Sequence, residues 1–412
     1  MGKEIRLKYA CYTTNLSISV VSTLSPILFV TFHTLYGISY TLLGLLVLVY
    51  FLAQLLVDLI FSFFSHKFNI PLAVKITPLL SVLGLGVYAA WPQIFPDSVY
   101  AGLMVGTLLF SMSNGFTEVL ISPVIAAIPA DDPDREMSKL HSVYAWGVVG
   151  VVLVSTLYLR LFGQNSWQYL PLLLMAVPVT SFLLYMGVQI PDMPKPEKLS
   201  GTFRYLKDKG LWLCFAAIFL GGATECTMSQ WASGYLEQAL GIPKVWGDVF
   251  GVAMFSVMLG LGRSLYAGYG KRISRVLLWG AVGAAVCYLA AAVSPWPVLS
   301  LVACGLTGFC ASMLWPGNLI VASDRFPDGG VFLFAMMAAG GDFGAAVGPQ
   351  LVGLITDAAI ASPGLTAVAA DLAMSPEQLG MKLGMLVGML FPLVGIPLFA
   401  VIHRNRKILE GK

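Results

Sequence analysis

Long apolar segments dominate this sequence and decide what it can fold into. A helix needs about 20 mainly apolar residues to cross the hydrocarbon part of a bilayer, and the sequence holds twelve such segments between short polar breaks. Only 11% of the residues are charged, against about 25% in soluble domains. So few charged side chains could not cover a water-soluble protein of 412 residues. The sequence therefore predicts an all-α integral membrane protein.

The twelve predicted transmembrane helices form two groups of six. A charged segment with three prolines separates the groups, so we predict an N-terminal half (1–190), a cytoplasmic linker (191–210) and a C-terminal half (211–412). Part of the linker, 201–210, is expected to form a short interfacial helix. The predicted spans are Lys8–Phe32, Tyr40–Ser65, Leu72–Ala90, Val99–Ile128, His141–Phe162, Tyr169–Gln189, Leu211–Leu236, Trp246–Tyr269, Ser274–Val293, Pro297–Ala322, Val331–Asp357 and Leu379–His403.

Basic residues gather on one side of these spans. With the N-terminus inside, all of the 24 Lys and Arg residues except Arg160, Lys244 and Lys382 lie in cytoplasmic segments, as the positive-inside rule requires. We therefore predict both termini in the cytoplasm and a multi-pass protein of the inner (cytoplasmic) cell membrane. The net charge of +3 gives no reason to expect nucleic-acid binding, and six cysteines without a CxxC pair predict neither a disulfide framework nor a metal site.

The two halves repeat each other. GFTEVLISP begins at Gly115 and GFCASMLWP begins at Gly308, an offset of 193 residues. In both copies an acidic residue, Asp131 or Asp324, follows eight positions after the proline. Two pseudo-symmetric six-helix halves of this kind are the plan of many secondary transporters.

With these features the chain resembles a major facilitator superfamily transporter over essentially its full length. The basic loop after the eighth span resembles the end of the family signature GxxxDRxGRR, with Gly270, Lys271 and Arg272 in matching places. The loop after the second span departs from it, with Ser65 in place of Asp and Phe68 in place of Gly. Within the family, GATECTMSQWAS and SMLWPGNLIVASDRFP look like the sugar-transporting groups related to fucose:proton symporters. The resemblance implies an alternating-access carrier and not an enzyme.

Acidic residues inside the predicted spans are candidates for carrying protons. A charge at the bilayer centre costs about 2.5–3.5 kcal/mol, and protonating a glutamate at neutral pH costs about 3.7 kcal/mol. Because the two costs are nearly equal, such a group can both bind and release a proton. We predict proton coupling through Glu225, Glu118 and Asp342, with no other cofactor, and sodium coupling stays open.

Each of these acids also has a structural interpretation. Glu225 lies near the centre of the seventh span, where we expect no Lys or Arg at its depth, and it could be a neutral acid bonded to a carbonyl or to a neighbouring threonine. Glu118 follows Asn114 by four residues and is expected on the same helix face. Asp342 could cap a turn loosened by glycines or pair across the halves. Asp58 and Arg263, near the inner ends of their spans, are predicted to act in gating.

Amide and indole side chains in the spans suit a sugar-like ligand, which has apolar C–H faces and a rim of hydroxyls. Packing is the alternative for each Trp. Pro26, Pro123 and Pro316 are expected to interrupt three of the spans, either freeing backbone groups or kinking the helix alone. The predicted substrate-binding residues are Asn15, Asn114, Gln230, Trp231, Trp315 and Asn318.

The predicted function is secondary active transport of a small polar, neutral solute, a sugar or sugar-like molecule, by proton symport. Two halves would rock about a central site bordered by spans one, four, seven and ten. The absence of a mid-span cation argues against phosphates and dicarboxylates. We expect a monomer whose partners are the small-molecule substrate and the lipid bilayer. A proton-driven exporter of lipophilic or cationic drugs or metabolites is the alternative, although the fifth span lacks the Gly-Pro pair typical of such antiporters.

Overall fold

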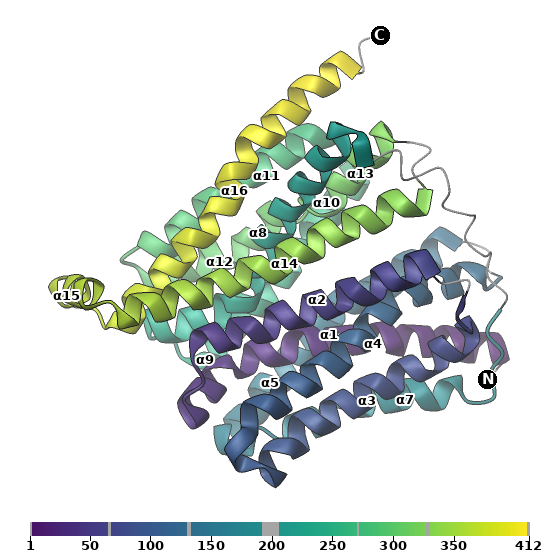
Figure 1. The fold of residues 1–412 in the computed structure, drawn as a ribbon, viewed down its shortest axis with the longest axis horizontal. Coiled ribbons are helices and arrows are strands. Elements are labelled where there is room, and N and C mark those ends of the chain that lie inside the picture. The colour runs from purple at the N-terminus through teal and green to yellow at the C-terminus, as the bar shows by residue number, and fades with distance from the viewer. Residues whose placement is uncertain are drawn as a thin grey trace. The chain divides into compact units, whose positions relative to one another are not determined.

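A computed structural model describes residues 2–64, 67–129, 133–191, 206–269, 272–326 and 330–409. The described residues form helices and their connections, without β-strands (Figure 1). Several features of the sequence lie outside them: most of the linker (192–205), with most of its predicted interfacial helix, and also Ser65, Asp131, Gly270 and Lys271.

The helices follow one another along the chain with short connections. Their bounds are α1 Lys3–Tyr36, α2 Tyr40–Phe64, α3 Ile70–Ile94, α4 Val99–Ala127, α5 Pro133–Phe162, α6 Tyr169–Leu174, α7 Ala176–Tyr185, α8 Lys209–Leu240, α9 Lys244–Trp246, the π-helix η5 Gly247–Ala253, α10 Met254–Tyr269, α11 Ile273–Val293, α12 Pro297–Ala311, α13 Pro316–Arg325, α14 Gly330–Ala361, α15 Pro363–Asp371 and α16 Pro376–Leu409.

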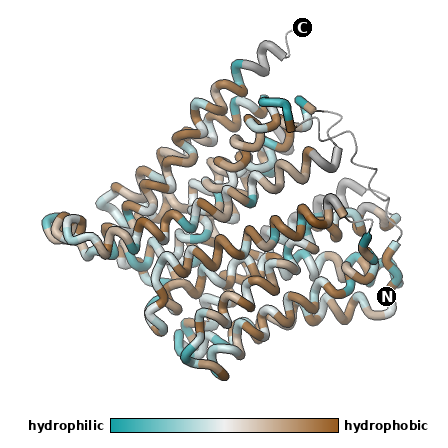
Figure 2. The backbone as a smooth tube through the Cα atoms, viewed as in Figure 1, coloured by the Kyte–Doolittle hydropathy of each residue, from teal (hydrophilic) through white to brown (hydrophobic). Residues whose placement is uncertain are grey.

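Among the described residues, eleven helical stretches are long and apolar enough to cross a membrane. Figure 2 shows apolar residues along most of their length and hydrophilic residues mainly near their ends. The sixth predicted span differs from expectation, because it consists of the two short helices α6 and α7, which meet at Met175. Pro178 has no N–H to bond with the carbonyl of Leu174, which explains the irregularity there.

The chain divides into two compact units, and the first consists of Met1–Thr31 and Val49–Leu199. Its helices α3 and α4 approach closely because glycine faces glycine. A Cβ atom on Gly84 would lie 2.9 Å from the carbonyl oxygen of Gly106, and one on Gly106 would lie 2.8 Å from that of Gly84. Small residues at helix crossings are typical of membrane proteins. In lipid the hydrophobic effect does not drive helices together, and small residues allow the close backbone packing that stabilises their association.

The second unit consists of Phe32–Leu48 and Ser200–Lys412. Glycines on α14 let it pack directly against α8: a Cβ atom on Gly344 would collide with the carbonyl oxygen of Phe219, and one on Gly348 would lie 3.0 Å from that of Ala223. The glycine-rich stretch around Asp342 is thus a continuous helix. The predicted glycine-loosened turn, with Asp342 as its cap, is wrong.

Only one of the three predicted proline interruptions is present. Helices α1 and α4 continue through Pro26 and Pro123. By contrast, α12 ends at Ala311 and α13 begins at Pro316. Because proline has no N–H, the carbonyl of Ser312 loses its usual partner four residues later. The tenth predicted span is therefore a broken helix, and the Ser312 carbonyl in its middle has no backbone N–H partner at Pro316.

Candidate functional site

In the first unit, an amide network joins α2 and α4. Gln54 on α2 accepts a hydrogen bond from Asn114 Nδ2 at 2.6 Å through its Oε1, and its Nε2 donates to Glu118 Oε2 at 2.9 Å. The two α4 residues, four apart, therefore face the same neighbour. One glutamine thus orients both the predicted substrate ligand Asn114 and the predicted proton carrier Glu118.

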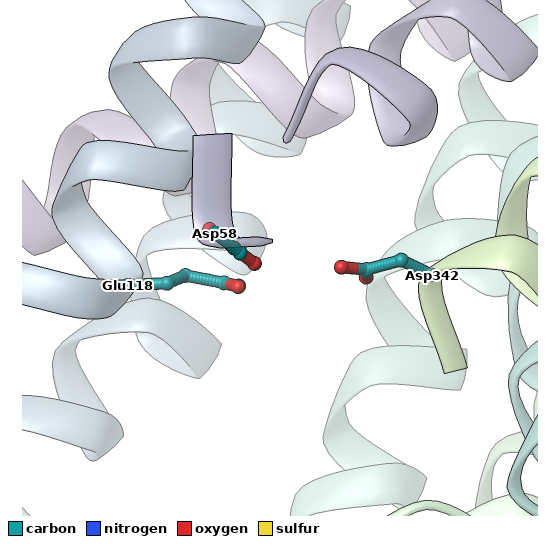
Figure 3. A group of neighbouring side chains, drawn as sticks. All are labelled: Asp58, Glu118 and Asp342. Atoms are coloured by element: carbon teal, nitrogen blue, oxygen red, sulfur yellow. The ribbon is translucent and has the colours of Figure 1, made fainter. Parts of the chain in front are cut away.

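A second carboxylate lies beside this network. Asp58 follows Gln54 by one helical turn on α2, is 6% exposed, and places a carboxylate oxygen within 4.8 Å of one of Glu118. Figure 3 shows these two side chains coming from α2 and α4, with Glu118 extending beside Asp58. Two carboxyls at this separation interact electrostatically. Asp58, predicted to act in gating, is thus part of an acid pair.

Asn15 and Ser19 attach α1 to α5. Asn15 Nδ2 donates to the carbonyl oxygen of Leu140 at 2.7 Å, and Ser19 Oγ donates to that of Tyr144 at 2.8 Å. A Cβ atom on Gly147 would lie 2.5 Å from Leu16 Cδ1, so the two helices touch. The amide N–H of Asn15 is used in packing in this structure, and its role as a substrate ligand stays a prediction.

In the second unit, Glu225 has a cationic partner, contrary to the expectation from the sequence. Arg263 Nη2 on α10 lies 3.2 Å from Glu225 Oε1 and 3.3 Å from Oε2 on α8. Glu225 is the seventeenth residue of the 32-residue helix α8, so this pair lies at mid-helix. Arg263 is in the second half of α10, and its long side chain reaches along the helix to a partner at another depth, which its position in the sequence does not reveal.

The break between α12 and α13 provides a second partner for Arg263. Arg263 Nε donates to the carbonyl oxygen of Ser312 at 3.1 Å, which is the carbonyl that Pro316 leaves without a helical partner. Asn318 Nδ2 donates to the carbonyl oxygen of Leu314 at 2.6 Å. The helix break thus provides the Ser312 carbonyl as an acceptor for Arg263. The predicted ligand Asn318 is 1% exposed, and its amide N–H is used by the Leu314 carbonyl at the break.

The aromatic candidates differ in accessibility. Trp231 is fully buried, and its Nε1 donates to the carbonyl oxygen of Pro349 at 2.8 Å, so it packs α8 against α14. Trp315 is only partly buried and stands at the helix break. Its ring lies over glycines, because a Cβ atom on Gly222 would be 3.1 Å from Trp315 Cζ3 and one on Gly341 would be 2.5 Å from Cζ2.

The remaining predicted site residues are Gln230 and Asp342. Gln230 is partly buried on α8, five residues after Glu225. Asp342 is 2% exposed on α14 and is the third labelled side chain of Figure 3. It belongs to the second unit, whereas Asp58 and Glu118 belong to the first.

The sequence did not reveal a polar cluster at the start of α2. Asp357 on α14 accepts hydrogen bonds from the backbone N–H of Tyr40 at 3.2 Å and of Thr41 at 2.6 Å. Glu377 on α16 accepts one from the Tyr40 hydroxyl and lies 3.3 Å from His33 Nε2. In the sequence these polar residues lie at the ends of predicted spans. Charged residues at span ends are normally solvated, so their position did not indicate a cluster.

Comparisons with known proteins agree with this architecture. The family model described as the Major Facilitator Superfamily matches residues 10–349. Similar solved structures include the POT family transporter PepTSo (TM-score 0.74, 14% identity, 98% of each chain covered). The nucleoside transporter NupG and a D-xylose-proton symporter each have a TM-score of 0.69 and 14% identity, over 97% of this chain and 99% of theirs. At these identities the likeness shows the fold. A search of curated proteins gave no match.

Proposed function

The chain belongs to the major facilitator superfamily, and we propose that within this family of transporters it is a proton-coupled symporter of a small hydroxylated solute. Alternating access carries the solute across the cell membrane. The observation that carries the coupling proposal is the pair of Asp58 and Glu118, whose carboxylate oxygens lie within 4.8 Å of each other on α2 and α4.

Geometry ranks the acid pair above Glu225 as the proton carrier. Glu225 contacts a guanidinium, which compensates its charge and lowers the cost of keeping it ionised. Glu118 instead accepts its hydrogen bond from the neutral amide of Gln54, and the neighbouring Asp58 adds a like charge. A proton relieves that repulsion, so the pair binds and releases a proton as its surroundings change.

The solute site we propose uses groups with free capacity. In the second unit, Gln230 and Trp315 are partly accessible and are the solute ligands we propose. In the first unit, Asn114 Oδ1 is buried without a hydrogen-bond partner among the described residues, and its role as a solute ligand stays a prediction. Amides that accept and donate, together with an indole face, match a polyhydroxylated molecule. Two proteins of similar structure are a D-xylose-proton symporter and a nucleoside transporter, and both of these solutes carry a sugar ring. The narrower likeness to groups related to fucose:proton symporters stays a prediction.

The test uses purified wild type and Glu118→Gln in proteoliposomes with an imposed pH gradient. Glutamine keeps the size and a hydrogen bond to Gln54 but cannot carry a proton. Wild type should accumulate the solute against its gradient, whereas Glu118→Gln should accumulate less than wild type and still exchange solute at equal concentrations. Asp97→Asn, an exposed acid in the turn before α4, is the matched control and should behave as wild type.

Two outcomes would overturn the coupling proposal. Accumulation by Glu118→Gln at the wild-type level would remove the acid pair from coupling. Accumulation that follows a sodium gradient and ignores the pH gradient would replace the proton as the coupling ion.

A further inference from the structure

Arg263 has hydrogen-bond donors that the structure does not use. A guanidinium has five N–H donors, and the structure uses Nε for Ser312 and Nη2 for Glu225. In the described part of the chain Nη1 makes no hydrogen bond, and the Arg263 side chain is 40% exposed. The pair of terminal nitrogens Nη1 and Nη2, called here the guanidinium fork, therefore still has N–H donors without an acceptor.

The present ion pair does not use the geometry in which arginine binds carboxylates best. Both oxygens of Glu225 approach the single nitrogen Nη2, at 3.2 and 3.3 Å. The stronger arrangement places two parallel N–H···O bonds from two nitrogens onto one carboxylate. A free carboxylate that reaches Nη1 and Nη2 together would make better hydrogen bonds than Glu225 does.

The surroundings of this fork suit a small hydroxylated body. The partly exposed ring of Trp315 packs over Gly222, which precedes Glu225 by one helical turn on α8, and an indole face suits the C–H side of a sugar-like molecule. Among the described residues of the second unit, Arg263 is the one basic side chain paired with a mid-helix acid. A single cation matches a single carboxylate and would leave the extra charge of a dicarboxylate or phosphate dianion uncompensated.

We propose that Arg263 is the anion-recognition residue of this transporter and that its solute is a small hydroxy monocarboxylate of the sugar-acid type. This inference rests on the proposed symport function and names its substrate class. The solute carboxylate replaces Glu225 on the guanidinium. It also revises the neutral solute expected from the sequence, because that expectation depended on the absence of a mid-span cation.

Displacement of Glu225 links solute binding to a proton. Arg263 compensates one carboxylate at a time, and an ionised Glu225 left without it at mid-membrane depth is unfavourable. Glu225 therefore takes one proton from water as the solute anion binds, in addition to the proton carried by the acid pair, and returns it when the solute leaves and the ion pair re-forms. Arg263 stays protonated throughout, so solute anion and proton together add no net charge.

Among the described residues of the second unit, the other ionisable groups that contact this part of α8 supply no second cation. Asp342 of α14 is near enough to act electrostatically on Cys226, and as an acid it supplies no cation. Tyr288 of α11 donates its hydroxyl to the Thr224 carbonyl oxygen at 2.8 Å. The sequence of α12 contains no charged residue, and that of α16 contains none between Lys382 and His403.

The experiment measures binding to the purified full-length chain by thermal shift and calorimetry. The probes are D-gluconate, D-glucuronate and D-lactate, with D-glucose as the uncharged counterpart, each between pH 5.5 and 7.5. In wild type at least one of the acids should bind while glucose does not, and the affinity should rise up to tenfold for each unit by which the pH falls, as uptake of one proton requires.

Variants separate recognition from folding. Arg263→Gln should weaken carboxylate binding at least tenfold. Glu225→Gln should bind the acid more tightly than wild type and lose the pH dependence, because the competing carboxylate is gone. Loss of an ordinary structural contact would not tighten binding. The double variant Glu225→Gln/Arg263→Gln leaves neither charge unpaired and should fold without binding the acid, and Arg275→Gln at the exposed start of α11 is the control.

Each adverse result has a defined meaning. Equal binding of glucose and the acids, unchanged binding in Arg263→Gln, or no binding of any acid would overturn the proposal. Gradient-driven uptake of glucose by wild type and Arg263→Gln alike would overturn the carboxylate inference while leaving the proton symporter intact. Absence of any gradient-driven uptake would instead reject the symport function itself.

Discussion

The start of helix α2 offers a quantitative test of how the segment Phe32–Leu48 is held in the second unit. Asp357 accepts two hydrogen bonds there, from the N–H groups of Tyr40 at 3.2 Å and Thr41 at 2.6 Å. A negative charge at a helix N-terminus is also favoured by the helix dipole. The substitution Asp357→Ala removes both bonds and the charge, while Ser39 Oγ still accepts from the Leu42 N–H at 3.3 Å, so the helix itself should persist.

The expected magnitude follows from the kind of bond lost. A hydrogen bond to a charged group contributes about 1.5–3 kcal/mol. Asp357 and Thr41 are only partly buried, and water can replace part of the interaction, so we take the net loss as about 1.5 kcal/mol. A loss of this size corresponds to roughly a tenfold change in an equilibrium constant. Asp357→Asn keeps a hydrogen-bond acceptor but removes the charge, so it should change this equilibrium constant less, by roughly threefold.

Hydrogen exchange of the backbone amides measures this effect directly. The Tyr40 and Thr41 amides should exchange about tenfold faster in Asp357→Ala than in wild type, with an intermediate rate in Asp357→Asn. Asp371→Ala, an exposed acid at the end of α15, should leave these rates unchanged. Unaltered exchange in Asp357→Ala would refute the claim that this carboxylate holds the start of α2.

Three further substitutions test the packing that positions the two polar networks. Asn318→Leu leaves the Leu314 carbonyl at the helix break without its side-chain donor, and a loss of about 1–3 kcal/mol should lower the thermal unfolding midpoint in detergent; an unchanged midpoint would contradict it. Gly344→Val places a side chain against the Phe219 carbonyl, and such overpacking should destabilise the fold by about 1–3 kcal/mol or more. The yield of folded protein on size exclusion should therefore fall more than for the control Gly364→Val, where the position is open. Gln54→Leu removes the amide between Asn114 and Glu118 and should weaken solute affinity at least severalfold with folded yield retained; wild-type affinity would show that the network does not orient the site.

The fold was largely predictable because the bilayer imposes a simple rule. Segments of about 20 apolar residues must form helices that satisfy their own backbone, so most span positions followed from hydropathy alone. Prolines were harder to interpret. Pro316 breaks its helix and Pro26 does not. At the break, the side chains of Arg263 and Asn318 bond the carbonyls of Ser312 and Leu314, and the sequence does not show such contacts.

The candidate site was less predictable, since it depends on which side chains meet. The residues Asn114 and Glu118 were found from their spacing, but the bridging Gln54 lies on another helix and has no sequence signal that points to them. The pairing of Glu225 with Arg263 was missed because position along a helix does not fix the depth of a long side chain. Burial of Trp231 was equally invisible, because an amphipathic pattern does not distinguish a packed indole from one that lines a cavity.

Proton movement coupled to solute flux tests the central proposal most directly. Proteoliposomes containing wild-type protein and a trapped pH-sensitive dye start with equal pH on both sides, with the membrane potential clamped. When a transported solute is added outside, symport predicts acidification of the interior at a rate that tracks solute uptake, and Glu118→Gln should acidify the interior less than wild type for each solute taken up. Alkalinisation would identify an exchanger of the exporter type, and solute uptake by wild type with constant internal pH would contradict proton coupling.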